Sequence, residues 1–103
     1  MTSRLEQLEV LAFRNPEDSF VQYAIALEYV SVKRFEEAAV ILERSMEQDP
    51  TYVPAFHQAA RTYEQMDETE DARRCYELGI ACAEQQGDTH ARGEMEEALR
   101  MME

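Results

Sequence analysis

An internal repeat limits what this chain can fold into more than any other feature of its sequence. Pro16 and Pro50 lie 34 residues apart, and the segments that follow them match position by position. Small residues fall on small residues, and most large apolar residues fall on large apolar or aromatic ones. The matched pairs include Ala26 with Ala60, Tyr29 with Tyr63, Ala38 with Ala72, Leu42 with Tyr76, and Ser45 with Gly79. Such a period is typical of a stack of similar structural units.

Within each repeat the apolar residues follow a helical period. Ile25, Ala26 and Tyr29 lie on one face at helical spacing, and the equivalent positions of the second repeat show the same pattern. Glu84 stands where the period would place another proline, so we expect the fifth helix to continue to Gln86, with Gly87 as a left-handed C-cap. The predicted helices lie near 3–14, 19–31, 35–48, 53–66, 70–86 and 89–101. Short connections make consecutive helices antiparallel.

The composition agrees with an all-α chain that forms a single domain. Ala, Glu, Leu, Arg, Gln and Met are abundant, and these residues favour helices. Glycine and proline number only three each in 103 residues, too few for a sandwich or a flexible linker. A chain of this length leaves no room for a second domain of ordinary size.

The repeat also predicts how the domain is divided. Leu8 falls on the position of Leu42, so residues 3–14 are expected to form a half repeat. Residues 16–50 then form the first repeat and residues 51–86 the second. The amphipathic segment 88–101 is expected to cap the second repeat, and a contact with another copy of the chain is its alternative use.

The same residues make the chain resemble the tetratricopeptide repeat family. That family carries a Trp, a Leu-Gly pair and a Tyr, followed by Ala, Phe and Pro, over 34 residues. The chain departs from this pattern at the Trp and Leu positions. Its first repeat has Gln22, Ile25-Ala26, Tyr29, Ala38, Leu42 and Pro50, and its second has Phe56, Ala59-Ala60, Tyr63, Ala72, Tyr76 and Glu84. The resemblance implies a right-handed α-solenoid of antiparallel helix pairs, with about six helices.

In this family the first helix of each pair lines a concave groove that holds extended or helical peptides. The resemblance therefore implies that the chain is a protein- or peptide-binding adaptor or scaffold. Two alternatives remain: the groove residues are buried by the chain itself, or the chain is a homo-oligomeric module that assembles through its open ends or its last helix. The groove candidates are Tyr23, Leu27 and Val30 in the first repeat, and His57, Gln58, Arg61 and Gln65 in the second.

The formal charge of −12 helps to choose between classes of partner. Nucleic acids and anionic membranes are bound by Lys and Arg, and neither half of the chain, divided at Pro50, is basic. We expect the chain to bind a protein or peptide, with a second copy of the chain as one option. We expect it to bind neither nucleic acid nor membranes. The first ten residues contain no long apolar stretch, so we expect neither a signal peptide nor a membrane span, and a cytoplasmic location.

The reactive residue types form no pattern that predicts chemistry. Cys75 and Cys82 lie seven residues apart in one predicted helix, about 10 Å along its axis, which is too far for a disulfide. We interpret them as small buried residues with free thiols. The two histidines, His57 and His90, have no partner at a spacing that indicates a catalytic pair. We therefore expect no cofactor, no metal site and no enzymatic activity.

Overall fold

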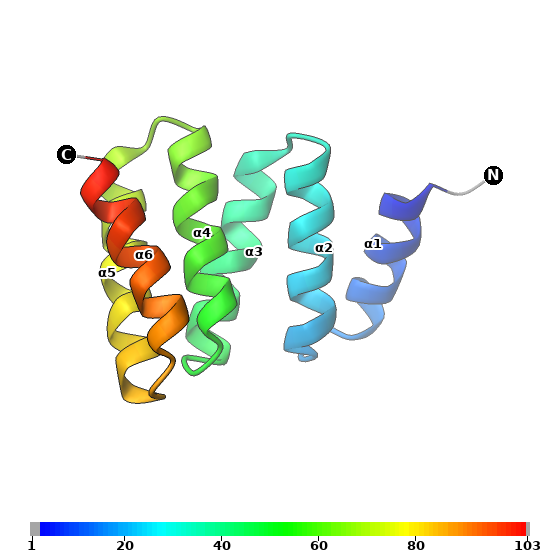
Figure 1. The fold of residues 1–103 in the computed structure, drawn as a ribbon. Coiled ribbons are helices and arrows are strands. Elements are labelled where there is room, and N and C mark those ends of the chain that lie inside the picture. Colours follow the sequence, from blue (N-terminus) through cyan, green and yellow to red (C-terminus); the bar gives the residue numbers. More distant parts are fainter. Residues whose placement is uncertain (1–2, 103) are drawn as a thin grey trace.

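The computed structural model describes residues 3–102 and places six α-helices in that range (Figure 1). Every helix begins and ends within one residue of its predicted range. None of residues 3–102 lies in a β-strand, so the all-α prediction is confirmed. The helices are α1 (Arg4–Arg14), α2 (Ser19–Ser31), α3 (Phe35–Gln48), α4 (Val53–Gln65), α5 (Thr69–Gln85) and α6 (Thr89–Met101).

Capping explains where several of these helices begin and end. Side-chain oxygens of Ser3, Asp18 and Asp88 accept hydrogen bonds from backbone N–H groups in the first turns of α1, α2 and α6. These N–H groups have no partner inside the helix, so the caps stabilise the helix starts. Gly87 follows α5 with a φ of 68°, which confirms the predicted left-handed residue at this end.

The helices form a layered stack. Most contacts join helices that are consecutive in the chain, from α1 against α2 to α5 against α6. In Figure 1 the helices α2, α4 and α6 form one row, with α3 and α5 behind it. We call α2, α4 and α6 the front row. The whole stack measures 43 × 28 × 19 Å. We propose that its units follow the predicted division into 3–14, 16–50, 51–86 and 88–101.

Small residues allow the helices to approach each other closely, as the repeat predicts. The four repeat alanines Ala26, Ala38, Ala60 and Ala72 are all 0% exposed. A Cβ atom added to Gly79 would lie 2.5 Å from Met95 Sδ and 2.9 Å from Phe56 Cβ. The position therefore has no room for a side chain.

The buried apolar residues form two clusters of unequal size. The larger cluster draws mainly on α3 to α6 and includes Leu42, Tyr76 and Met95. The smaller cluster contains Ile25, Tyr29 and Ala38, against which partly buried residues of α1 pack. None of the residues of α1 is itself buried. The first helix is therefore attached to the stack through a thinner core than the helices that follow it.

Candidate functional site

Two neighbouring hollows lie along the front row, and six of the seven predicted groove residues line them. The first hollow, of about 250 Å³, is lined by Val30, Gln58, Arg61 and Gln65, among others. The second, of about 210 Å³, is lined by Tyr23, His57, Gln58 and Arg61 together with residues of α6. Leu27 lines neither hollow, although its side chain is 38% exposed. Gln58 and Arg61 belong to both hollows and stand between them.

The α2 part of this surface is apolar and partly covered by the chain's own residues. The ring of Tyr23 packs edge-to-face against Tyr52, with 5.2 Å between the ring centroids. Burial and the neighbouring Tyr52 raise the pKa of the Tyr23 hydroxyl, although Arg61 lowers it. Val30 is half-buried and lines the first hollow. Tyr23 is therefore held in place and offers only part of its surface to a guest.

The α4 part of the surface carries a free cation. Arg61 is exposed, and within residues 3–102 it forms no salt bridge. His57 is half-buried, with its ring centroid 6.0 Å from that of Tyr76. Burial, and then Arg61, lower the pKa of His57 from its ordinary value of 6.5, which favours the neutral imidazole. Arg61 is thus the cation that the two hollows share, and Lys33 adds a second cation to the first hollow.

Two carboxylates, from α6 and from the residue that caps it, change the charge of this half of the site. His57 and Arg61 alone would make it locally basic, but Asp88 and Glu94 line the same hollow. The second hollow therefore combines one guanidinium with two carboxylates and is mixed in charge. Asp88 also caps α6, because its side chain accepts a hydrogen bond of 3.0 Å from the Ala91 N–H.

A hydrogen bond repeats between successive helices, and the sequence analysis missed it. Tyr29 donates to Glu9 at 2.8 Å, and Tyr63 donates to Glu43 at 2.9 Å. Each pair spans 20 residues, and the second pair lies 34 residues after the first. Aligning the polar residues in the repeat register, as was done for the apolar ones, would have revealed it.

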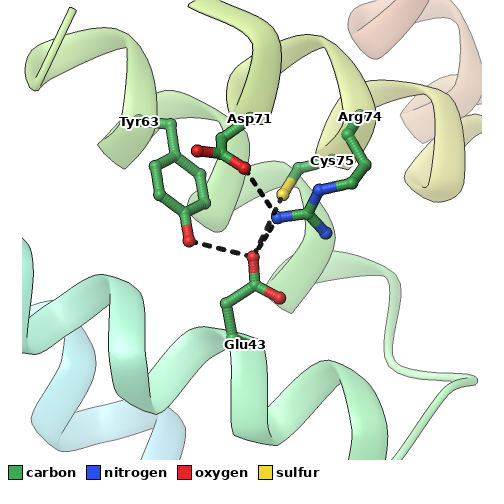
Figure 2. A network of polar contacts seen from close by, with 5 residues as sticks. All are labelled: Glu43, Tyr63, Asp71, Arg74 and Cys75. Atoms are coloured by element: carbon green, nitrogen blue, oxygen red, sulfur yellow. Dashed lines mark hydrogen bonds and ion pairs between the residues drawn. The ribbon is translucent and has the colours of Figure 1, made fainter. Parts of the chain in front are cut away.

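The second of these bonds belongs to a larger polar network, shown in Figure 2. Glu43 of α3 accepts from Tyr63 of α4 and pairs with Arg74 of α5. Arg74 also lies 3.2 Å from Asp71, and the Cys75 thiol lies 4.0 Å from Glu43. The network joins three helices, and none of its residues lines either of the two hollows.

The thiols in and near this network are unsuited to nucleophilic chemistry. Both cysteines are free and buried, as predicted. Burial raises the pKa of the Cys75 thiol to about 12, and it also raises the pKa of Cys82. The thiolate is the reactive form of cysteine, so both side chains are inert at neutral pH. They behave as small core residues.

The described part of the chain shows no further chemical centre. Among residues 3–102, no group of three His, Cys, Asp or Glu side chains is placed to hold a metal ion. No helix within that range is long and apolar enough to cross a membrane. A third hollow, of about 440 Å³, opens between α3 and α5 beside Phe56, Leu78 and Cys82. The sequence did not predict this hollow.

Known proteins share both this arrangement and its sequence pattern. The sequence profile described as "Tetratricopeptide repeat" matches residues 29–92. A TPR repeat-containing protein of Pseudomonas aeruginosa is 27% identical over 99 residues, covering 96% of this chain and 94% of that protein. The solution structure of a tetratricopeptide repeat domain protein from Salinibacter ruber is 33% identical, with a TM-score of 0.80, covering 85% of this chain and 89% of its own. A protein from Bordetella parapertussis, 24% identical over 99% of this chain and 89% of its own, has the same fold with a TM-score of 0.84. The chain belongs to the tetratricopeptide repeat family.

Proposed function

We propose that this chain is a non-catalytic adaptor that binds a peptide segment of a partner protein along the front row. Tetratricopeptide repeats are generally protein-interaction modules, and members of the family typically lack catalytic activity. The fold alone does not assign a function, so the proposal rests on the two hollows around Arg61. Their combined lining offers apolar contact, amide groups and two cations, Arg61 and Lys33, that form no salt bridge within residues 3–102.

Arg61 is the observation that carries the proposal. It is exposed, it lines both hollows, and within the described residues it forms no salt bridge with a carboxylate. A guanidinium can bind a carboxylate through two parallel hydrogen bonds. Arg and Tyr are also frequent anchors of protein interfaces. We therefore propose a guest segment with a carboxylate facing Arg61 and an apolar side chain facing Tyr23 or Val30.

The carboxylates of α6 add a second requirement for the guest. Asp88 and Glu94 lie on the far side of the second hollow from α2 and would repel an acidic residue there. A basic residue of the guest at this end would be favoured. The proposed guest thus places its acidic and basic groups at different points along the surface.

The test compares partner capture by three matched baits. Wild-type chain, a Tyr23→Ala/Arg61→Glu variant and an Arg44→Glu control are immobilised and exposed to native cell extract, and the bound proteins are quantified by mass spectrometry. Arg44 is an exposed residue of α3 that lines neither front-row hollow, so the control reverses a charge away from the site. We expect a set of proteins that the wild type and the control retain and the double variant loses.

Equal capture by all three baits would contradict the proposal. Loss of Tyr23 also removes its contact with Tyr52, so the folding of each bait is checked by circular dichroism. The single Arg61→Glu variant leaves that aromatic contact in place, and it should lose most of the same proteins.

A further inference from the structure

The first helix carries three exposed apolar side chains, which we call the apolar strip; one of them, Phe13, also lines a hollow with residues of α2 and α3. Val10, Leu11 and Phe13 are 51%, 46% and 87% exposed. The helix packs on its neighbours through its opposite side, where Leu8 and Ala12 lie against the smaller core cluster. At about 100° per residue, Val10 points almost directly away from that side. In Figure 1 α1 stands at one end of the stack, apart from α4 to α6.

The repeat itself does not require apolar residues at two of these positions. In α3, the residue equivalent to Val10 is Arg44 and the residue equivalent to Phe13 is Glu47, and both are exposed, whereas the residue equivalent to Leu11 is Ser45, which is buried. Val10 and Phe13, at positions where the following repeat carries charges, call for their own explanation. Exposed apolar surface of this kind marks an interaction site.

The charges beside the strip indicate what that site binds. Glu6 lies four residues before Val10, and Arg14 lies four residues after it. Within residues 3–102 neither side chain forms a salt bridge, although Glu6 accepts a hydrogen bond of 3.2 Å from Ser3. Residues four apart share one helix face, so the exposed face of α1 carries a negative charge, an apolar centre and a positive charge in order.

This order is complementary to itself. If two α1 helices pack antiparallel about a two-fold axis at Val10, each Glu6 comes opposite the Arg14 of the other copy. A parallel pair would instead place like charges together, which is unfavourable. A contact between identical patches related by a two-fold axis is the usual basis of a homodimer.

We propose that α1 is a self-association surface, on which two copies of this chain pack antiparallel with Val10 at the centre. Val10 and Phe13 supply the apolar contact, with Leu11 at its edge, and two Glu6–Arg14 pairs set its register. The interface involves a single helix of each copy, and each copy carries a charge of −12. The association is therefore expected to be weak and concentration-dependent. It leaves the front row of both copies accessible, so it is independent of the proposed peptide binding.

The mass of the chain in solution tests whether it self-associates. Sedimentation equilibrium is measured over a concentration series from micromolar to millimolar. We expect the average mass of the wild type to rise from 12.0 kDa toward twice that value. Phe13→Asp should keep the mass at that of the monomer throughout. A wild type that stays monomeric over the whole series overturns the proposal.

Charge exchange tests the antiparallel register. Arg14→Glu places two acidic groups opposite each other at both ends of the contact, and Glu6→Arg places two basic groups there. Each variant alone should therefore be monomeric. An equimolar mixture of the two should associate again, because every acidic group then faces a basic one. The Glu6→Arg/Arg14→Glu double variant should also associate by itself, for the same reason.

The controls separate the proposed contact from loss of folding or a general effect of charge. Arg100→Glu makes the same change of charge on α6, at the opposite end of the stack from α1 (Figure 1), and should self-associate as the wild type does. Circular dichroism of each variant checks that the helices are intact. Mixing cannot restore association to a chain that has failed to fold. A mixture that remains monomeric, or an Arg14→Glu variant that associates normally, overturns the proposed register.

Discussion

The two tyrosine–glutamate contacts that the repeat relates, Tyr29–Glu9 and Tyr63–Glu43, look alike but hold together different amounts of structure. The bond between Tyr29 and Glu9 joins α2 to α1 only. The bond between Tyr63 and Glu43 joins α4 to α3, and Arg74 extends it to α5. The same repeated hydrogen bond is thus peripheral at one end of the chain and central in the middle.

The position of the cation accounts for this difference. The residue equivalent to Arg74 in the first repeat is Val40, so Glu9 has no guanidinium at that place. There the cation is Arg34, which lies over the Tyr29 ring at 4.8 Å from its centroid. The residue equivalent to Arg34 in the second repeat is Glu68. The repeat keeps the tyrosine–carboxylate bond but moves the positive charge from the ring to the carboxylate.

The largest expected difference between the α1–α2 end of the stack and its α3–α4 middle concerns their apolar cores. Leu8 and Leu42 occupy equivalent positions, but Leu42 is 0% exposed whereas Leu8 is only partly buried. We expect Leu42→Ala to lower the free energy of unfolding by about 2–5 kcal/mol. Leu8→Ala should cost about 1–2 kcal/mol, because less apolar surface is lost from the core. Urea unfolding measures both, and equal losses would contradict the view that α1 is the less firmly attached helix.

A second pair of equivalent positions, Ser45 and Gly79, tests how tightly each repeat is packed. A methyl group at Gly79 would clash with Met95 and Phe56. Overpacking of this kind lowers the free energy of unfolding by about 1–3 kcal/mol. The better helix propensity of alanine offsets about 1 kcal/mol of that loss. The Ser45 hydroxyl is buried without a hydrogen-bond partner, so Ser45→Ala should cost nothing. Thermal unfolding should therefore show a loss for Gly79→Ala alone.

Removing the guanidinium beside Glu43, or adding one beside Glu9, should make the stability contributed by each tyrosine–glutamate contact resemble that of the other. Arg74→Val gives Glu43 the surroundings of Glu9, and Val40→Arg gives Glu9 a guanidinium. Partly exposed ion pairs contribute about 0.2–1 kcal/mol, so we expect a loss of that size for the first change and a gain for the second. Urea unfolding of each variant in a Glu9→Gln or Glu43→Gln background supplies the control. A gain from Val40→Arg that survives Glu9→Gln would show that the new charge acts elsewhere.

The smallest effect should appear only at alkaline pH. Burial raises the pKa of Tyr29 and Tyr63 above the ordinary value of 10.0, and the bonded carboxylates raise it further. A pKa raised by folding means that the protonated hydroxyl stabilises the native state. That contribution is complete below pH 10 and is lost as the pH rises through the folded-state value. The urea midpoint of the wild type should fall as the pH is raised from below 10 to above 10. Tyr29→Phe and Tyr63→Phe should each make this fall smaller. An unchanged fall in both variants would assign it to other groups.

The helices and their register could be predicted because the signals for them are local. Pro16, Pro50 and Gly87 mark helix ends by backbone geometry alone, and the apolar spacing identifies the packed face of each helix. The repeat register also placed six of the seven groove candidates around two real hollows. Leu27 was placed on the right helix, but the position of its side chain relative to those hollows depends on how α2 and α4 pack.

The polar surroundings of the site could not be predicted in the same way. Asp88 and Glu94 reach the second hollow from α6, and α5 has 17 residues where α3 has 14. The 34-residue register is therefore lost before α6 begins. The Arg74–Glu43 pair was missed for another reason: it has no counterpart in the first repeat, and an ion pair across 31 residues leaves no periodic signal.

The layered contacts described above also govern how the chain folds. Because each helix packs mainly on the next one, most contacts join residues that are near in sequence. The chain loses little conformational entropy in closing short loops before these contacts form, and this favours fast folding. In such arrays the free energy is roughly a sum over units and the junctions between them. A unit added to or removed from one end changes that sum by a single increment and leaves the geometry of the remaining units intact.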